Sequence, residues 1–288
     1  MNKKWVYCGI DENKVKEVKE KNNLTDLVAS ILVGRNILNE DEIKVFLNPT
    51  RNDFYDPFLL DGMKEAVDRI IEVIDKKERI IIYGDYDVDG ITSICVLKQF
   101  LEDRGIEVAQ TIPNRLEEGY GLNKEAIKRI AEEKYNLMIT VDCGISGIEE
   151  IEYANSLGIQ TIVTDHHEPL AVLPEAIAVI DPKIKTNKYP FNQLAGVGVV
   201  FKLIQAISQR LELDEKEYLK YLDLVAIGTI SDIVPLIDEN RVIAKLGLKL
   251  VEVTKNIGLK TLLSSLGYQK MNSMTISFGV APRINACG

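Results

Sequence analysis

The sequence predicts an α/β fold: a mostly parallel sheet with helices on both faces, preceded by a helical lead-in and followed by a helical portion. Two observations predict it. Between residues 63 and 180, short apolar, β-branched runs alternate with segments in which apolar residues recur at helical spacing. After residue 193 the strand-like runs stop, and helical spacing continues to about residue 266. Strands that alternate with helices are joined by right-handed crossovers, which make neighbouring strands parallel.

The first part of the chain is predicted to be helical. Apolar residues at helical spacing indicate helices over residues 24–33 and 39–47, and Asn39 is a suitable N-cap for the second. Two X-Pro dipeptides then interrupt the helical pattern before residue 60. We therefore expect residues 1–60 to form a separate helical extension.

The middle of the chain alternates helix and strand. A stripe of apolar residues predicts a helix over residues 63–74. Residues 61–195 are expected to form the α/β core, and residues 196–288 its mainly helical continuation. Strands are expected at residues 80–83, 108–112, 137–141, 159–164 and 176–180, with helices at 92–103, 123–134 and 146–158.

Composition narrows the class of protein. The 288 residues are 46% apolar and 27% charged, which is typical of a globular chain with a large core. No apolar run is long enough to cross a bilayer, and the first residues lack the apolar stretch of a signal peptide. The four cysteines are scattered without a Cys-x-x-Cys pair, so we expect neither a disulfide framework nor a thiolate zinc site. These features predict a cytoplasmic protein with no membrane association.

The net charge of −9 is unfavourable for a simple nucleic-acid binder, whose affinity rests on Lys and Arg. Two considerations weaken this objection. Cations bound among clustered acids would reverse the local field. The sequence also stops abruptly at residue 288, which we interpret as the end of a fragment, so the charge of the whole protein is expected to differ.

Acidic residues follow several of the predicted strands. In an open parallel sheet, ligands bind at the carboxyl ends of the strands. Carboxylates and imidazoles are the ligands of divalent cations, so this placement predicts a metal site at that edge. The residues concerned are Asp85, Asp87 and Asp89 after the first strand, Asp142, the sequence Asp165-His166-His167, and Asp181.

Each feature also has a simpler interpretation. Residues 85–90 could form an ordinary acidic turn, but three acids at alternate positions after a buried strand repel one another without a cation. The two histidines alone fit a solvated loop equally well, and Asp165 could orient one imidazole. Residues 196–198, with two glycines, fit close helix packing better than a dinucleotide-binding loop.

Several motifs resemble those of known nucleases. Residues 83–93, 141–144 and 165–167 resemble the DHH phosphoesterase superfamily, and residues 229–236 are similar to its fourth acidic motif. The resemblance to RecJ-type single-strand DNA exonucleases is closer and covers essentially the whole chain. It rests on residues 56–63, 113–122, 194–198 and 281–286.

The resemblance implies an exonuclease that removes nucleotides from single-stranded DNA in the 5′→3′ direction during repair and recombination. Its partners would include a single-strand-binding protein or a helicase. It implies two divalent ions, for which the mixed ligand set favours Mn²⁺ with Mg²⁺ as a weaker substitute. Asp142 would bridge the ions, and Asp85 and His167 would be adjacent catalytic groups. The implied metal ligands are Asp87, Asp89, Asp142, His166 and Asp232, and the expected substrate contacts are Arg115, Tyr120 and Arg283.

Two alternatives stay open at this point. A DHH phosphoesterase acting on short oligonucleotides or cyclic dinucleotides would use the same metals, although the RecJ-like segments argue against it. A non-catalytic replication scaffold is expected to lose metal ligands, whereas every matching acid and histidine is present here.

Overall fold

A computed structural model describes residues 9–113, 119, 121–268 and 270–286. The chain divides into two compact units, the first ending at Asp53 and the second beginning at Phe54. The three-part division predicted from the sequence, at residues 1–60, 61–195 and 196–288, stays a prediction.

The first unit is helical. Its helices are α1 (Glu12–Asn22), α2 (Asp26–Gly34) and α3 (Glu40–Leu47), followed by the 3₁₀ turn η1 (Arg51–Asp53). The predicted cap of α3 is present, since the Asn39 side chain accepts a hydrogen bond of 2.8 Å from the Asp41 N–H. Helix α1 was not predicted, because it is mostly polar and buries only Val18. The unit encloses a small core of Val18, Ala29, Leu32, Ile37 and Ile43.

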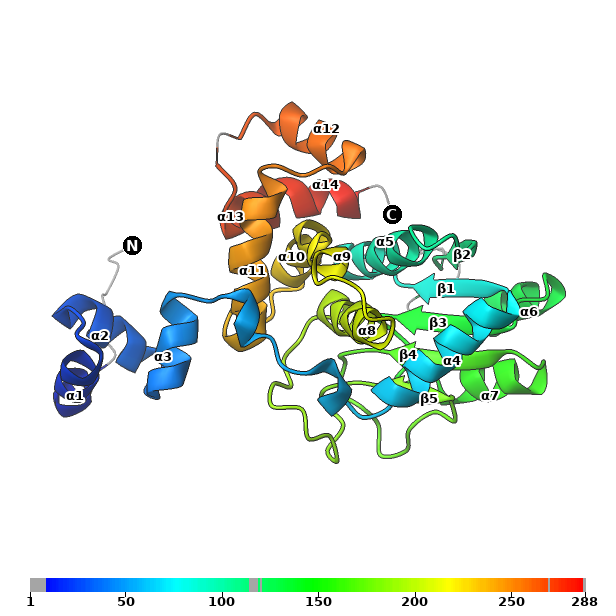
Figure 1. Ribbon diagram of the computed structural model, residues 1–288, viewed down its shortest axis with the longest axis horizontal. Helices are drawn as coiled ribbons and strands as arrows, with labels where there is room; N and C mark the ends of the chain where they lie inside the picture. The colour runs from blue at the N-terminus through cyan, green and yellow to red at the C-terminus, as the bar shows by residue number, and fades with distance from the viewer. Residues whose placement is uncertain (1–8, 114–118, 120, 269, 287–288) are drawn as a thin grey trace, which may run out of the picture. The chain divides into compact units, whose positions relative to one another are not determined.

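The second unit contains a five-stranded sheet in the order β2-β1-β3-β4-β5. All four strand pairs are parallel, which confirms the predicted fold class. Figure 1 shows the strands stacked in this order. The order reverses direction between β1 and β3, and ligands bind at such a switch point in open α/β sheets. The strands are β1 (Ile80–Gly84), β2 (Val108–Thr111), β3 (Leu137–Val141), β4 (Gln160–Thr164) and β5 (Ala178–Ile180).

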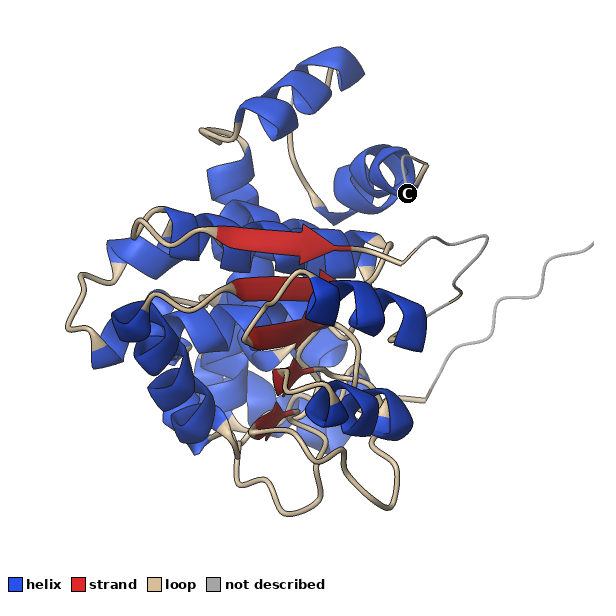
Figure 2. Ribbon diagram, turned by 90° about the vertical axis from the view of Figure 1, so that its right-hand side faces the viewer, coloured by secondary structure: helices blue, strands red, loops and turns tan. Residues whose placement is uncertain are grey.

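Helices cover both faces of the sheet, as predicted (Figure 2). Successive strand residues point to opposite faces. Ile80 and Ile82 therefore join one apolar cluster, while Ile81 and Tyr83 join the other. The larger cluster lies under α4 (Met63–Lys76), α5 (Val88–Glu102) and α8 (Gly196–Arg210), and the smaller under α6 (Lys124–Glu132) and α7 (Ile148–Ser156).

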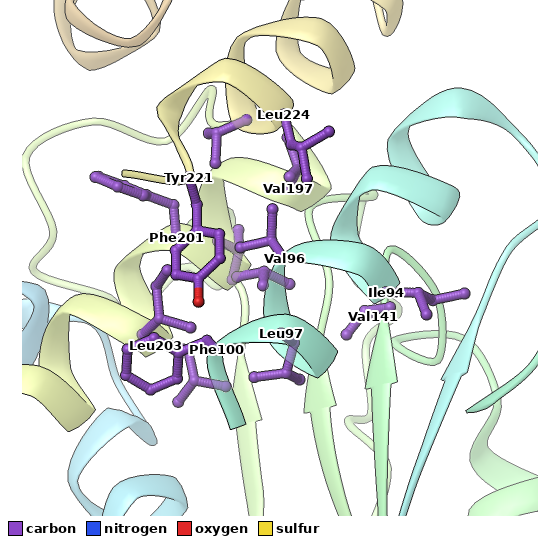
Figure 3. Packing of buried hydrophobic residues seen from close by; sticks show 14 of the residues in the cluster. Ile94, Val96, Leu97, Phe100, Val141, Val197, Phe201, Leu203, Tyr221 and Leu224 are labelled. Carbon is purple, nitrogen blue, oxygen red and sulfur yellow. The ribbon is translucent and has the colours of Figure 1, made fainter. Parts of the chain in front are cut away.

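The larger core fixes the helix ends that build the functional site. Side chains of α5, α8 and α10 (Leu222–Ser231) pack together there, and the rings of Phe100 and of Tyr221, the residue before α10, have centroids 6.2 Å apart (Figure 3). Helix α5 begins at Val88, earlier than the predicted start at residue 92, because the Asp87 side chain caps it. A rigid core beneath these helix ends keeps their positions constant, which a preorganised site requires.

Helices dominate the rest of the second unit, as predicted for the segment after residue 193. A fully buried ion pair joins two of them: Lys202 of α8 and Glu239 of α11 (Asp238–Val251), with Nζ and Oε1 3.0 Å apart. No helix in the described parts of the chain has the length and apolar character needed to cross a membrane. The remaining elements are η2 (Pro57–Leu59), α9 (Lys216–Leu219), α11 (Asp238–Val251), α12 (Ile257–Leu266), α13 (Ser273–Thr275), the π-helix η3 (Ile276–Val280) and α14 (Ala281–Asn285).

Candidate metal centre

Three aspartates follow β1 at the point where α5 begins. Asp85 is buried directly after the strand, at 1% exposure. Asp87 caps α5, and its carboxylate accepts a hydrogen bond of 2.9 Å from the Gly90 N–H. Asp89 lies in the first turn of α5 and is buried. Glycine is required at residue 90 because a Cβ there would lie 2.5 Å from the Asp85 carbonyl oxygen.

The amino terminus of α8 holds the Asp89 carboxylate. Its two oxygens accept hydrogen bonds of 2.7 Å from the Gly196 N–H and 2.9 Å from the Val197 N–H. The unpaired N–H groups at a helix start favour an anion, so these bonds orient the carboxylate. Sequence reasoning missed these donors and interpreted residues 196–198 as close helix packing. Packing is also present, since a Cβ on Gly196 would lie 2.3 Å from Asp142 Oδ1.

Asp142 follows β3 in a left-handed conformation, with φ 58°. Aspartate adopts this conformation more readily than most residues. The side chain is buried, and its Oδ1 accepts no hydrogen bond from any described residue. Burial, followed by the charge of Asp89, raises the pKa of Asp142 well above the ordinary value. A buried carboxylate with an unsatisfied oxygen is unstable unless a cation compensates it.

His166 follows β4 and lies among the carboxylates. Its Nε2 is 3.1 Å from Asp142 Oδ1, 3.9 Å from Asp89 Oδ2 and 3.8 Å from Asp232 Oδ2. Neither ring nitrogen forms a hydrogen bond of good geometry within the described part of the chain. Burial, followed by the charge of His167, lowers the pKa of His166 to about 4. The imidazole is therefore neutral near pH 7, which is the form that binds metals.

Asp165 holds the loop that carries the histidines. Its carboxylate accepts hydrogen bonds of 2.9 Å from the Ile145 N–H and 2.7 Å from the His166 N–H. The Nδ1 of His167 lies 2.7 Å from Asp165 Oδ1, and this hydrogen bond raises the pKa of His167. Burial alone would raise the pKa of Asp165, but the bonds from His167 and Ile145 bring it below the ordinary value. Asp165 is thus an ionised partner that orients its neighbours.

Asp232 completes the cluster from the carboxyl end of α10. Its side chain is 23% exposed, and burial, followed by the charge of Asp87, raises its pKa to about 6. Burial and then the charge of Asp232 raise the pKa of Asp89 well above the ordinary value. The distance from Asp232 to the strand-end acids could not be inferred from the sequence, because Asp232 follows a helix rather than a strand.

The donor atoms fit divalent cations. Two overlapping groups have candidate ligand atoms within 4.8 Å of one another: Asp142 with His166 and His167, and Asp89 with His166 and Asp232. Oxygen and imidazole donors suit Mn²⁺ and similar ions, and crowded, desolvated carboxylates gain most from a nearby positive charge. Buried atoms on Asp142 and His166 that have no hydrogen-bond partner among the described residues also indicate a cation site.

The other predicted site residues are placed less closely. Asp87 is near enough for its charge to raise the pKa of Asp89 and Asp232, but it belongs to neither ligand group. Arg115 and Tyr120 lie outside the described residues. Arg283 is exposed on α14, and its Nη1 donates a hydrogen bond of 2.7 Å to the Gly279 carbonyl. The roles predicted for these residues stay predictions.

Sequence reasoning also missed Lys183. Its positive charge is among the smaller influences that lower the pKa of Asp232 and of His166, so it lies within electrostatic range of the cluster. Within the residues that the structure describes, Lys183 forms no ion pair. Its N–H donates a hydrogen bond of 2.7 Å to buried Asp181, the acid after β5, whose pKa burial raises to about 7. The sequence signal that could have identified Lys183 is its position two residues after the strand-end Asp181.

Comparison with known proteins gives a consistent result. The family model described as "DHH family, N-terminal domain" matches residues 79–229. The chain is 46% identical over 287 residues to "Single-stranded-DNA-specific exonuclease RecJ" of Bacillus subtilis (strain 168), a match that covers 99% of this chain and 36% of that protein. This chain therefore spans a little over a third of the length of that curated relative.

Solved structures with the same fold include metal-bound proteins. The crystal structure of exonuclease RecJ bound to manganese has a TM-score of 0.73 and 37% identity, covering 79% of this chain and 57% of that one. The structure of RecJ in complex with Mn²⁺ from Thermus thermophilus has a TM-score of 0.81 and 30% identity, covering 96% of this chain and 39% of that one.

Proposed function

This chain belongs to the DHH family, and from that membership we propose that it is the catalytic part of a metal-dependent exonuclease. It would hydrolyse phosphodiester bonds of single-stranded DNA in the 5′→3′ direction, in DNA repair and recombination. The observation that carries the proposal is the convergence of Asp89, Asp142, His166 and Asp232, in which buried atoms of Asp142 and His166 have no hydrogen-bond partner among the described residues. Buried polar atoms are otherwise satisfied in native proteins.

The metal ligands follow from this cluster. Asp87, Asp89, Asp142, His166 and Asp232 would hold two Mn²⁺ ions, with Mg²⁺ as a weaker substitute. When bound, such ions lower the pKa of an attacking water and neutralise charge on the phosphate. The Mn²⁺ complexes of RecJ proteins support this assignment.

The chain's own residues would orient the metal ligands and supply a proton to the substrate. The N–H groups at the start of α8 hold the Asp89 carboxylate in a fixed direction. Because its pKa is raised, His167 keeps its proton to a higher pH than a free imidazole, and it would hold a phosphate oxygen or protonate the leaving oxygen. Asp165 fixes the orientation of that ring, and buried Asp85 would be an adjacent catalytic group.

Single-stranded DNA is the proposed substrate because the curated relative's name specifies it. Arg115 and Arg283 would contact phosphates, and Tyr120 would stack on a base or bond to a phosphate. Lys183, whose charge acts on Asp232, would contribute a further positive charge near the phosphates. Partners of the whole protein would include a single-strand-binding protein or a helicase.

The test is hydrolysis by the purified chain with Mn²⁺. Single strands labelled at either end, duplex DNA and a cyclic dinucleotide are offered separately, with Asp142→Asn as the inactive control. We expect mononucleotides to appear first from the 5′ end of the single strand. Cleavage of the cyclic dinucleotide alone would instead support the short-substrate phosphoesterase, and strand binding without any cleavage would support the scaffold.

A further inference from the structure

Ile233, next to the metal centre, combines backbone strain with exposure. Its φ is 62°, and it is the one β-branched residue at positive φ in the described part of the chain. β-Branched side chains are genuine outliers in this conformation, and helices that end in it normally use glycine or asparagine. Helix α10 ends at Ser231, two residues before Ile233, so glycine would be the ordinary choice there.

The Ile233 side chain contributes little to the core. It is 86% exposed, the highest value among the exposed large apolar side chains of the described residues. Both the positive φ of Ile233 and the exposure of its side chain destabilise the folded chain, so an isoleucine at this position does not contribute to stability. Strain that folding does not require indicates a functional contact.

The location identifies the occupant. Ile233 directly follows Asp232, whose Oδ2 is 3.8 Å from His166 Nε2, and consecutive Cα atoms are only about 3.8 Å apart. A phosphate at the metal centre would therefore place its attached nucleoside within reach of Ile233. The surroundings are charged, with Asp87, His167 and Lys183 acting on Asp232. An apolar side chain on a charged rim suits a ligand with an anionic part and a flat apolar part.

We propose that Ile233 is a platform for the base of the terminal nucleotide, packing against its face while the adjoining phosphate occupies the metal centre. The inference rests on the proposed function and assigns a substrate contact within it. Every base has an apolar face, so such a contact is tolerant of sequence, as an exonuclease that proceeds along a strand requires.

The test compares affinities without turnover. Parent, Ile233→Gly and Ile233→Asn are titrated with two 5′-phosphorylated oligonucleotides whose first linkages resist hydrolysis, in the presence of Mn²⁺. One carries a normal 5′-terminal base and the other an abasic residue there. We expect the parent to prefer the normal base by about three- to tenfold, the gain from burying part of an isoleucine side chain. Both variants should lose most of this preference while binding the abasic strand like the parent.

Melting temperature and Mn²⁺ affinity distinguish a base contact from a structural role, and the values given next are those expected for a base contact. Because Ile233→Gly relieves strain, its melting temperature should rise by about 2–4 °C, and its Mn²⁺ affinity should equal that of the parent. Leu157→Gly is the matched control, since Leu157 is also an exposed branched residue but lies after α7, at the opposite end of β4 from His166. It should keep the base preference.

Three outcomes would overturn the proposal: an unchanged preference in both variants, no preference in the parent, or weakened Mn²⁺ binding by Ile233→Gly. The last would make Ile233 a positioning residue for Asp232. Failure of the parent to hydrolyse single-stranded DNA would instead refute the proposed function, and the affinities would still be measurable.

Discussion

Replacing Asp142 by asparagine should stabilise the metal-free protein and abolish its activity. The Oδ1 of Asp142 and the Oδ2 of Asp89 lie 3.1 and 3.9 Å from the same nitrogen of His166, so the two oxygens are at most about 7 Å apart. At that distance, and at an effective dielectric constant near 20, two carboxylates repel by about 2–3 kcal/mol. Asparagine has the same shape and tolerates the left-handed backbone.

The size of the stabilisation follows from this repulsion. The raised pKa of Asp142 means that part of the repulsion is already relieved by protonation, so we expect a gain of about 1–2 kcal/mol. The melting temperature in the presence of a chelator at pH 7.5 should then rise by about 2–6 °C. Adding Mn²⁺ should reverse the order, because an ion at a hundredfold its dissociation constant stabilises the parent by about 2.7 kcal/mol.

Asp165→Asn is the matched control, with the opposite sign expected. Asp165 accepts hydrogen bonds from the backbone at Ile145 and His166, and its pKa is lowered, so the ionised form is stabilised by folding. Its replacement should destabilise the protein by about 2–4 kcal/mol, through weaker charge-assisted bonds. A metal-free Asp142→Asn protein that melts below the parent would refute the reasoning. So would Mn²⁺-dependent hydrolysis reduced less than about a hundredfold, since Asp142, if it bridges the two ions as proposed, would be needed by both.

Four further predictions concern the glycines of α8, the titration of Asp181 and the binding of single strands. Gly196→Ala should lower the free energy of unfolding by about 1–3 kcal/mol and remove most of the activity, because its Cβ would lie 2.3 Å from Asp142 Oδ1. Gly198→Ala is the control, since its Cβ would lie 3.3 Å from the nearest side chain, and it should lose less in both melting and turnover assays. The pKa of Asp181 is about 7 in the folded protein against an ordinary value of 3.8, so this group favours folding at low pH, and that contribution is lost as the pH rises to about 7. The melting temperature of Asp181→Asn should therefore rise relative to that of the parent between pH 4 and pH 7.5. A constant difference between the two melting temperatures would contradict the raised pKa. Lys183→Gln should weaken single-strand binding and lower the slope of log affinity against log salt by about one, whereas an unchanged slope would exclude a phosphate contact. A longer form of the protein should show a steeper salt dependence than this chain, and equal slopes and affinities would mean that the additional region does not hold the strand.

The sheet and the strand-end acids could be predicted from the sequence, because both depend on local patterns. Short buried runs such as residues 137–141 are continuous in the sequence, and a parallel sheet brings the residues that follow them to one edge. Asp142 and His166 could therefore be placed near each other without coordinates. The start of α5 was misplaced, since the capping by Asp87 competes with the interpretation of residues 85–90 as a turn.

Other features depend on contacts between residues far apart in the sequence, and only the tertiary structure decided them. Gly196 donates to Asp89 across 107 residues, so no local pattern marks it as part of the site. The pKa values of Asp89, Asp142 and Asp232 are raised by burial and by the charges of neighbouring carboxylates, and a bound cation would relieve that crowding. The strain and exposure of Ile233 follow from how α10 ends beside that cluster. Short-range spacing determines secondary structure and strand ends, whereas desolvation and backbone strain arise only when distant segments pack together.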